Sequence, residues 1–142
     1  MTKYCTNSSY GTVDNKTTLE PEDDTATQIM GGDWRMPTAT EFQELYDNTT
    51  NEWVEDYNGS GVNGMKFTSK TNGKSIFFPA SGHANGTGVI NRGSYGGYWS
   101  SSLHPSYSRN GLYLYFNSGY IYPQFSSYRY YGFCVRSVLR NK

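Results

Sequence analysis

The side chains that most often carry out catalysis are scarce in this chain of 142 residues. His83 and His104 are the only histidines, and no sequence motif typical of a catalytic nucleophile surrounds any serine. Cys5 and Cys134 could form a disulfide, but no C-x-x-C spacing indicates a zinc or redox site, and we expect two free thiols. No Gly-rich stretch has the spacing of a phosphate-binding loop. We therefore expect a protein that is not an enzyme and that uses no metal or cofactor.

Tyrosines that could bind a partner are concentrated in the last third of the chain. Ten of the 14 tyrosines lie between Tyr95 and Tyr131, among many serines and asparagines. A tyrosine presents a large amphipathic ring at a small entropic cost, and serine and asparagine add adaptable hydrogen bonds, as in antibody combining sites. The alternative is a sheet whose tyrosines only reflect their high β-propensity. We favour binding, because tyrosines with only that role would be spread over the whole chain.

The alternation of residue types predicts which side chains form this surface. In residues 112–116, apolar residues alternate with tyrosines, so a strand there would have one apolar face and one tyrosine face. Ile121 is likewise expected to point inward between two outward tyrosines. The expected ligand contacts are His104, Ser106, Tyr107, Ser108, Arg109, Tyr113, Tyr115, Tyr120, Tyr122, Phe125, Ser126, Ser127, Tyr128, Tyr130 and Tyr131.

Short secondary-structure elements must position these contacts. Thr38 and Glu41 have the spacing of a capping box, which predicts that a helix begins there. Asn72-Gly73 separates two apolar stretches and predicts a β-hairpin, because this dipeptide readily adopts positive φ. Residues 1–33 and 82–97 have the composition of loops. The chain is therefore expected to be a single α+β domain over residues 1–142, with short antiparallel strands and one or two helices.

The charges are unevenly divided along the chain, although the net charge is zero. Residues 1–56 carry all 12 acids but only three bases, whereas residues 57–142 carry the other nine bases. This division could indicate an anionic partner for the second half. Because the nine bases are scattered singly, we favour neutralisation between the two halves of one fold.

Composition also restricts the class of protein. The aromatic content of 17% and the zero net charge argue against a disordered chain. No apolar stretch approaches the roughly 18–20 residues that a membrane-spanning helix needs, so we expect no membrane insertion. The first residues, Met1–Asn7, lack the apolar segment of a signal peptide.

Four motifs follow one another in a characteristic order. They are Gly-Gly-Asp-Trp-Arg-Met-Pro-Thr at 31–38, Phe-Phe-Pro-Ala-Ser-Gly at 77–82, Tyr-Trp-Ser-Ser at 98–101 and Gly-Phe-Cys-Val-Arg at 132–136. Together they resemble the Fibrobacter succinogenes major paralogous domain family, common in gut Bacteroides-type bacteria and their phages, over residues 4–140. The resemblance implies a C-type-lectin-like fold of the formylglycine-generating-enzyme branch. It also implies a scaffold that includes Trp34, Arg35, Pro37, Phe77, Phe78, Trp99, Phe116, Phe133 and Val135.

Residues 103–136 also resemble the variable region of proteins diversified by a retroelement, among them phage tropism-determinant proteins. In such regions the adenines of a template are miscopied, and Asn codons are the usual targets. Changes at the adenines of AAC reach every amino acid except Lys, Glu, Gln, Met and Trp. Between Leu103 and Tyr131 only Gln124 belongs to that set. The resemblance implies that the template keeps Pro123, Gln124, Arg129, Gly132, Phe133, Val135 and Arg136 unchanged.

This second resemblance implies a receptor-binding protein on a phage virion or a bacterial cell surface. Its partner would be a protein or glycan receptor. A nucleic acid is not the expected partner, although Arg109 and Arg129 among aromatic rings would permit stacking on bases.

Two alternatives remain. A fixed sequence would favour an undiversified bacterial adhesin or glycan-binding module, because stacked tyrosines suit sugar faces. A degenerate formylglycine-generating-type enzyme is less favoured, because those enzymes use two neighbouring cysteines near the end of the domain and only Cys134 lies in that half. Calcium-dependent sugar binding of the C-type lectin kind is not expected either, since its Glu-Pro-Asn, Gln-Pro-Asp and Trp-Asn-Asp motifs are missing and no acid follows Asp56.

Overall fold

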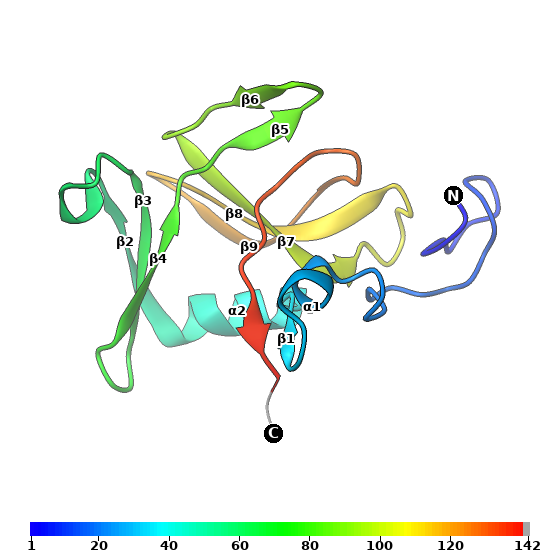
Figure 1. The fold of residues 1–142 in the computed structure, drawn as a ribbon, viewed down its shortest axis with the longest axis horizontal. Helices are drawn as coiled ribbons and strands as arrows, with labels where there is room; N and C mark the ends of the chain where they lie inside the picture. The colour runs from blue at the N-terminus through cyan, green and yellow to red at the C-terminus, as the bar shows by residue number, and fades with distance from the viewer. Residues whose placement is uncertain (141–142) are drawn as a thin grey trace.

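The computed structural model describes residues 1–140, which form mainly antiparallel β-structure (Figure 1). Strands account for 40% of the chain and helices for 14%, so the α+β class expected from the sequence is wrong and the protein is β-rich. The elements in chain order are α1 (Thr25–Met30), β1 (Trp34–Arg35), α2 (Ala39–Asn48), β2 (Thr49–Val54), the 3₁₀ turn η1 (Tyr57–Gly59), β3 (Gly64–Ser69), β4 (Ser75–Pro79), β5 (His83–Asn85), β6 (Gly88–Ile90), β7 (Tyr95–Leu103), β8 (Asn110–Asn117), β9 (Ile121–Tyr128) and β10 (Val138–Leu139).

The class prediction failed because segments expected to be loops form regular structure. Residues 82–97 contain β5, β6 and the start of β7, and the three-residue strands β5 and β6 pair through the turn at Gly86. Residues 1–33 contain α1, whose first turn is capped by the buried carboxylate of Asp24 through the amide of Thr27. These elements are too short for a periodic apolar pattern, and tertiary contacts stabilise them.

The strands form four small sheets. Their orders are β1–β10, β2–β3–β4, β5–β6 and β7–β8–β9. Helix α2 packs against all three strands of the last sheet. In Figure 1 the β5–β6 hairpin and the first part of the C-terminal segment, which we define as residues 129–137, lie on the opposite side of this sheet from α2, and the chain then runs down to β10. The β7–β8–β9 sheet is therefore covered on one face by a helix and partly covered on the other by loops and a short hairpin.

Two local predictions are confirmed. Thr38 and Glu41 form the capping box at the start of α2, and Glu41 also makes two hydrogen bonds with Arg35. The hairpin around Asn72-Gly73 joins β3 to β4, but only Gly73 has a positive φ. The turn therefore spans residues 70–73, rather than being the two-residue turn that Asn-Gly favours.

The core lies between α2 and the two larger sheets. The side chains of Leu114 and Phe116 from β8 are fully buried there with Phe42 of α2 and Phe78 of β4. Ile121 packs against the same cluster. Leu114, Phe116 and Ile121 therefore point inward as the alternation predicts, whereas Leu112 is half-buried and lies outside this cluster.

The ion pairs of Lys3, Lys16 and Arg35 connect to acids of the same half of the chain. These pairs thus do not provide the expected neutralisation between the two halves. Cys5 is buried, Cys134 is exposed, and both are free thiols. Within residues 1–140, no helix is both long enough and apolar enough to cross a bilayer.

Candidate ligand-binding surface

The outer face of the β7–β8–β9 sheet carries tyrosines, as the alternation predicts. We define the tyrosine face as the sheet surface formed by Tyr113 and Tyr115 of β8 and by Tyr122 and Phe125 of β9. Tyr113 is the cross-strand partner of Phe125, and Tyr115 is the partner of Tyr122. Such partners point to the same side of a sheet, so all four rings share one face.

A β-bulge makes this arrangement possible. Between the two pairs, β9 has two residues, Pro123 and Gln124, where β8 has only Leu114. In a regular strand Tyr122 and Phe125 would point to opposite faces, whereas the extra residue brings both to the tyrosine face. Proline fits at a bulge because it has no amide proton to donate to the ladder. The Gln124 side chain points the other way and donates to the carbonyl of Ala39 in α2 at 3.2 Å.

The rings form a continuous aromatic chain across this side of the molecule. Tyr120 stacks on Tyr122, and Tyr122 contacts Phe125 with ring centroids 5.1 Å apart. Phe125 contacts Tyr113 at 5.8 Å, and Tyr113 stacks on Phe133 of the C-terminal segment at 4.4 Å. The chain continues from Phe133 through the neighbouring rings of Tyr131, Tyr130 and Tyr128.

Tyr113 is covered despite its position on the tyrosine face. Its side chain is only 6% exposed, because the C-terminal segment folds back over the sheet and places Phe133 on its ring. Burial raises the pKa of Tyr113 to about 12. We therefore remove Tyr113 from the contacts expected from the sequence.

Ser108 is also removed, because it is buried and holds the N-terminal segment. Its hydroxyl accepts a hydrogen bond from the backbone amide of Thr6 at 2.9 Å and lies 3.0 Å from the Thr6 hydroxyl. Arg129 supports the same junction by donating to the carbonyls of Ser108 and Tyr4. His104 is half-buried and shapes this loop, since its Nδ1 accepts from the amides of Ser106 and Tyr107.

The remaining expected contacts differ in how far they reach the solvent. Ser126 is the cross-strand partner of Leu112 and therefore lies on the side of the sheet opposite the tyrosine face. The half-buried contacts are His104, Tyr115, Ser126, Ser127 and Tyr131. The exposed contacts are Ser106, Tyr107, Arg109, Tyr120, Tyr122, Phe125, Tyr128 and Tyr130.

Three aromatic residues near this surface were not predicted from the sequence. His83 of β5 lies against the rings of Tyr131 and Phe133, and Tyr95 of β7 lies against Tyr115. Tyr10 comes from the N-terminal segment and lies under the guanidinium of Arg109. All three lie outside the tyrosine-rich strands β8 and β9, and no local pattern in the sequence links them to the surface.

The acidic residues near the N-terminus lie apart from the aromatic surface. Within residues 1–140, Glu20, Glu22 and Asp23 form the group with the spacing of a metal site, and the ammonium of Lys3 occupies its centre at 2.7–3.5 Å. Hydrogen bonds from Lys3 and then from the Tyr4 hydroxyl hold the pKa of Asp23 below its usual value. Because the Lys3 ammonium forms ion pairs with these three carboxylates, the group needs no metal ion to balance its charge.

Comparison with known families gives one match. The family model described as the Lcl C-terminal domain matches residues 3–136, which include every element from α1 to β9. This match supports the family resemblance drawn from the four motifs. No curated protein and no solved structure matches the chain significantly.

Proposed function

The chain belongs to the Lcl C-terminal domain family, and from this we propose that it is a ligand-binding module without enzymatic activity. Its contact surface is the exposed part of the aromatic chain on β8, β9 and the C-terminal segment. A retroelement diversifies this surface. The partner is a receptor on a cell surface, and the module is carried by a phage virion or a bacterial cell.

The observation that carries the proposal is the amount of aromatic surface left in contact with water. Phe125 is 44% exposed, Tyr122 is 43% exposed and Tyr130 is 71% exposed, although each sits on or beside a well-packed sheet. Large contiguous aromatic surfaces are uncommon on proteins that bind nothing. Aromatic side chains held by a rigid sheet lose little entropy on binding, which makes them effective anchors.

The positions that the template is expected to keep unchanged have structural contacts, which supports diversification of the others. Gln124 bonds to α2, and Arg129 bonds to the carbonyls of Ser108 and Tyr4. Gly132 lies so close to β5 that a Cβ there would be 2.9 Å from the Cβ of Ala84. Arg136 donates to the carbonyl of Phe77 at 3.2 Å. Changes at these positions would disturb the scaffold, whereas changes at exposed rings would alter only the surface.

Deep sequencing of the 3′ third of the gene across a population tests diversification. We expect variation at adenine-derived positions between Leu103 and Cys134, together with a nearby template that is almost a copy of this region. We also expect the codons of Gln124, Arg129 and Gly132 to be constant. An invariant gene without a template would contradict diversification and favour a dedicated adhesin or glycan-binding module.

Alanine substitution tests the contact surface itself once a binding partner has been isolated. The double variant Tyr122→Ala/Phe125→Ala should lose binding and keep the thermal transition of the parent within a few degrees. Ile29→Ala is a matched control, because Ile29 is a 78% exposed apolar residue of α1 outside the tyrosine face. Full binding by the double variant, or equal loss in the control, would contradict the assigned surface.

A further inference from the structure

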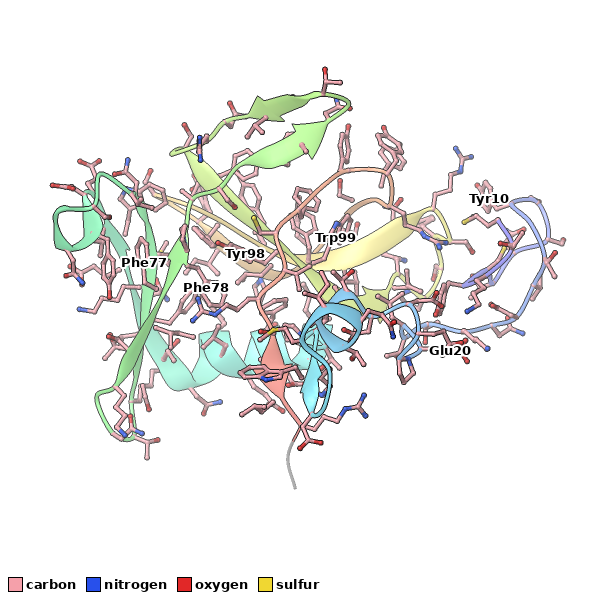
Figure 2. The ribbon with its side chains drawn as sticks, viewed as in Figure 1. Tyr10, Glu20, Phe77, Phe78, Tyr98 and Trp99 are labelled. Carbon is pink, nitrogen blue, oxygen red and sulfur yellow. The ribbon has the colours of Figure 1, made fainter. Side chains whose placement is uncertain are left out.

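The N-terminal segment contributes one wall of a groove at the end of the proposed surface. The groove has a volume of about 350 Å³ and is lined by Tyr10, Tyr107, Arg109, Asn110 and Tyr128. Figure 2 shows Tyr10 on the N-terminal loop, at the opposite end of the molecule from Phe77. Tyr10 is thus brought beside residues that are about a hundred positions away in the sequence.

Arg109 is the only cation lining this groove, and its charge is not neutralised. Its guanidinium lies 4.5 Å from the centroid of the Tyr10 ring and makes no hydrogen bond or ion pair with another side chain of residues 1–140. The contact with Tyr10 leaves the N–H groups of Arg109 available, because a cation stacked on a ring face keeps its edge free. Arg129, by contrast, uses its guanidinium to hold the N-terminal segment.

The surrounding sequence provides no carboxylate for Arg109. No acid follows Asp56. Asp14, the acid nearest to Tyr10 in the sequence, accepts hydrogen bonds from the backbone amides of Tyr4, Cys5 and Lys16. Glu20, Glu22 and Asp23 are paired with Lys3. An arginine with a free planar edge is suited to bidentate binding of a carboxylate. The groove therefore complements a negatively charged group from outside this chain.

We propose that this groove binds an aspartate or glutamate side chain of a protein partner. The inference rests on the proposed function, because it assigns part of the same surface. A second hollow of about 830 Å³ continues from the groove past Tyr128 and Tyr130. A polypeptide can place one carboxylate on Arg109 and lay apolar side chains along the exposed rings. Tyrosine and arginine are also the residue types enriched at the centres of protein–protein interfaces.

Tyr10 gives this groove a wall that diversification would not change. It lies outside residues 103–136, and the contacts of Thr6 with Ser108 hold its segment beside the loop that carries Arg109. An arginine fixed in this way loses less conformational entropy on binding than a free one. Variants of the surface that keep both Arg109 and Ser108 should therefore share a preference for acidic partners.

Selection of short random peptides on the immobilised protein tests this inference. Peptides selected by the parent should be enriched in Asp and Glu, and the enrichment should disappear when Arg109→Gln is used instead. For a purified selected peptide, we expect Arg109→Gln to weaken binding at least about tenfold. Arg109→Lys should give an intermediate loss, because it keeps the charge without the planar fork. Arg92→Gln, at an exposed arginine outside the groove, should change the affinity less than about twofold.

A peptide in which the Asp or Glu is replaced by Asn or Gln tests whether the carboxylate is the group that contacts Arg109. This peptide should bind the parent as weakly as the acidic peptide binds Arg109→Gln, and the two changes together should cause no further loss. Tyr10→Leu should also weaken the acidic peptide. Selected peptides that need Tyr122 and Phe125 but bind the parent and Arg109→Gln equally would overturn this inference and leave the proposed function standing. If glucuronate or a sulfated oligosaccharide bound at Arg109 more tightly than the selected peptide, the assignment to a protein partner would be overturned.

Discussion

Two residues of the same sheet face have different roles because only one of them is covered. Tyr113 and Tyr122 both belong to the tyrosine face, but Phe133 stacks on Tyr113, whereas Tyr122 is 43% exposed. The ring of Tyr113 is therefore part of the packing that holds the C-terminal segment on the sheet. The ring of Tyr122 is free to contact a ligand.

We predict that Tyr113→Ala destabilises the fold by about 3–5 kcal/mol, as is typical for removal of a buried aromatic ring. Tyr122→Ala should cost less than about 1 kcal/mol, because it removes a side chain that is largely in water. Urea denaturation followed by circular dichroism measures both changes. Equal stability losses in the two variants would mean that Phe133 does not cover Tyr113 in solution.

The same burial predicts a loss of stability at alkaline pH. Burial raises the pKa of both Tyr98 and Tyr113 to about 12, and the hydroxyl of Tyr98 donates to the carbonyl of Pro79 at 2.8 Å. In the unfolded chain a tyrosine ionises near pH 10, so the folded state holds these two protons more tightly. The stability should therefore be constant with respect to these groups below about pH 10 and fall between about pH 10 and 12.

A pH titration of tyrosinate absorbance, with circular dichroism on the same samples, measures this loss. The ionisation of Tyr98 and Tyr113 should coincide with the loss of the folded state. Tyr98→Phe should shift the alkaline transition to higher pH, since it removes one of the two groups. A transition at the same pH in this variant would argue against a role for Tyr98 ionisation.

At the scale of elements, the sequence was informative where a local interaction determines the structure. The capping box of Thr38 and Glu41 involves residues three positions apart, and the strand alternation of residues 112–116 involves nearest neighbours. Both were predicted. The bulge at Pro123 and Gln124 was not predicted, and the bond that Gln124 makes there goes to Ala39, 85 positions away. Residues 82–97 were expected to be a loop for a similar reason, since β5 is held by Gly132 as well as by β6.

The capping box is expected to contribute measurably to the position of α2. Thr38→Ala removes the acceptor for the amide of Glu41, which costs about 1 kcal/mol in typical helices. Thr40→Ala is the matched control, because Thr40 is exposed in the same helix and alanine favours helix there. Denaturant midpoints should therefore fall for Thr38→Ala and remain equal or rise for Thr40→Ala. A midpoint of Thr38→Ala equal to that of the parent would show that Arg35 and Glu41 alone fix the start of α2.

At the scale of the whole molecule, the N-terminal segment meets the last third of the chain at the proposed binding surface. The N-terminal loop is held by Ser108, which is 102 positions from Thr6, and by Arg129, which is 125 positions from Tyr4. No sequence pattern predicts contacts over such distances, which explains why Ser108 was expected to touch a ligand and why Tyr10 was overlooked. The position of Tyr10 at the groove depends on the Ser108 hydroxyl, which the sequence alone suggested was available to a ligand.

The contact between Ser108 and Thr6 should therefore control the order of the N-terminal segment. Ser108→Ala leaves the Thr6 amide without its acceptor, and an unsatisfied donor of this kind costs about 1–3 kcal/mol if it stays buried. The segment can avoid this cost by opening locally toward water. Amide hydrogen exchange should thus become faster at Tyr4, Cys5 and Thr6, while the amides of β8 keep their protection. Ser106→Ala, at an exposed serine of the same loop, should leave both regions unchanged. If protection at Tyr4 to Thr6 survived in Ser108→Ala, Arg129 and Asp14 would be sufficient to hold the segment, and Tyr10 would keep its place beside Arg109 without Ser108.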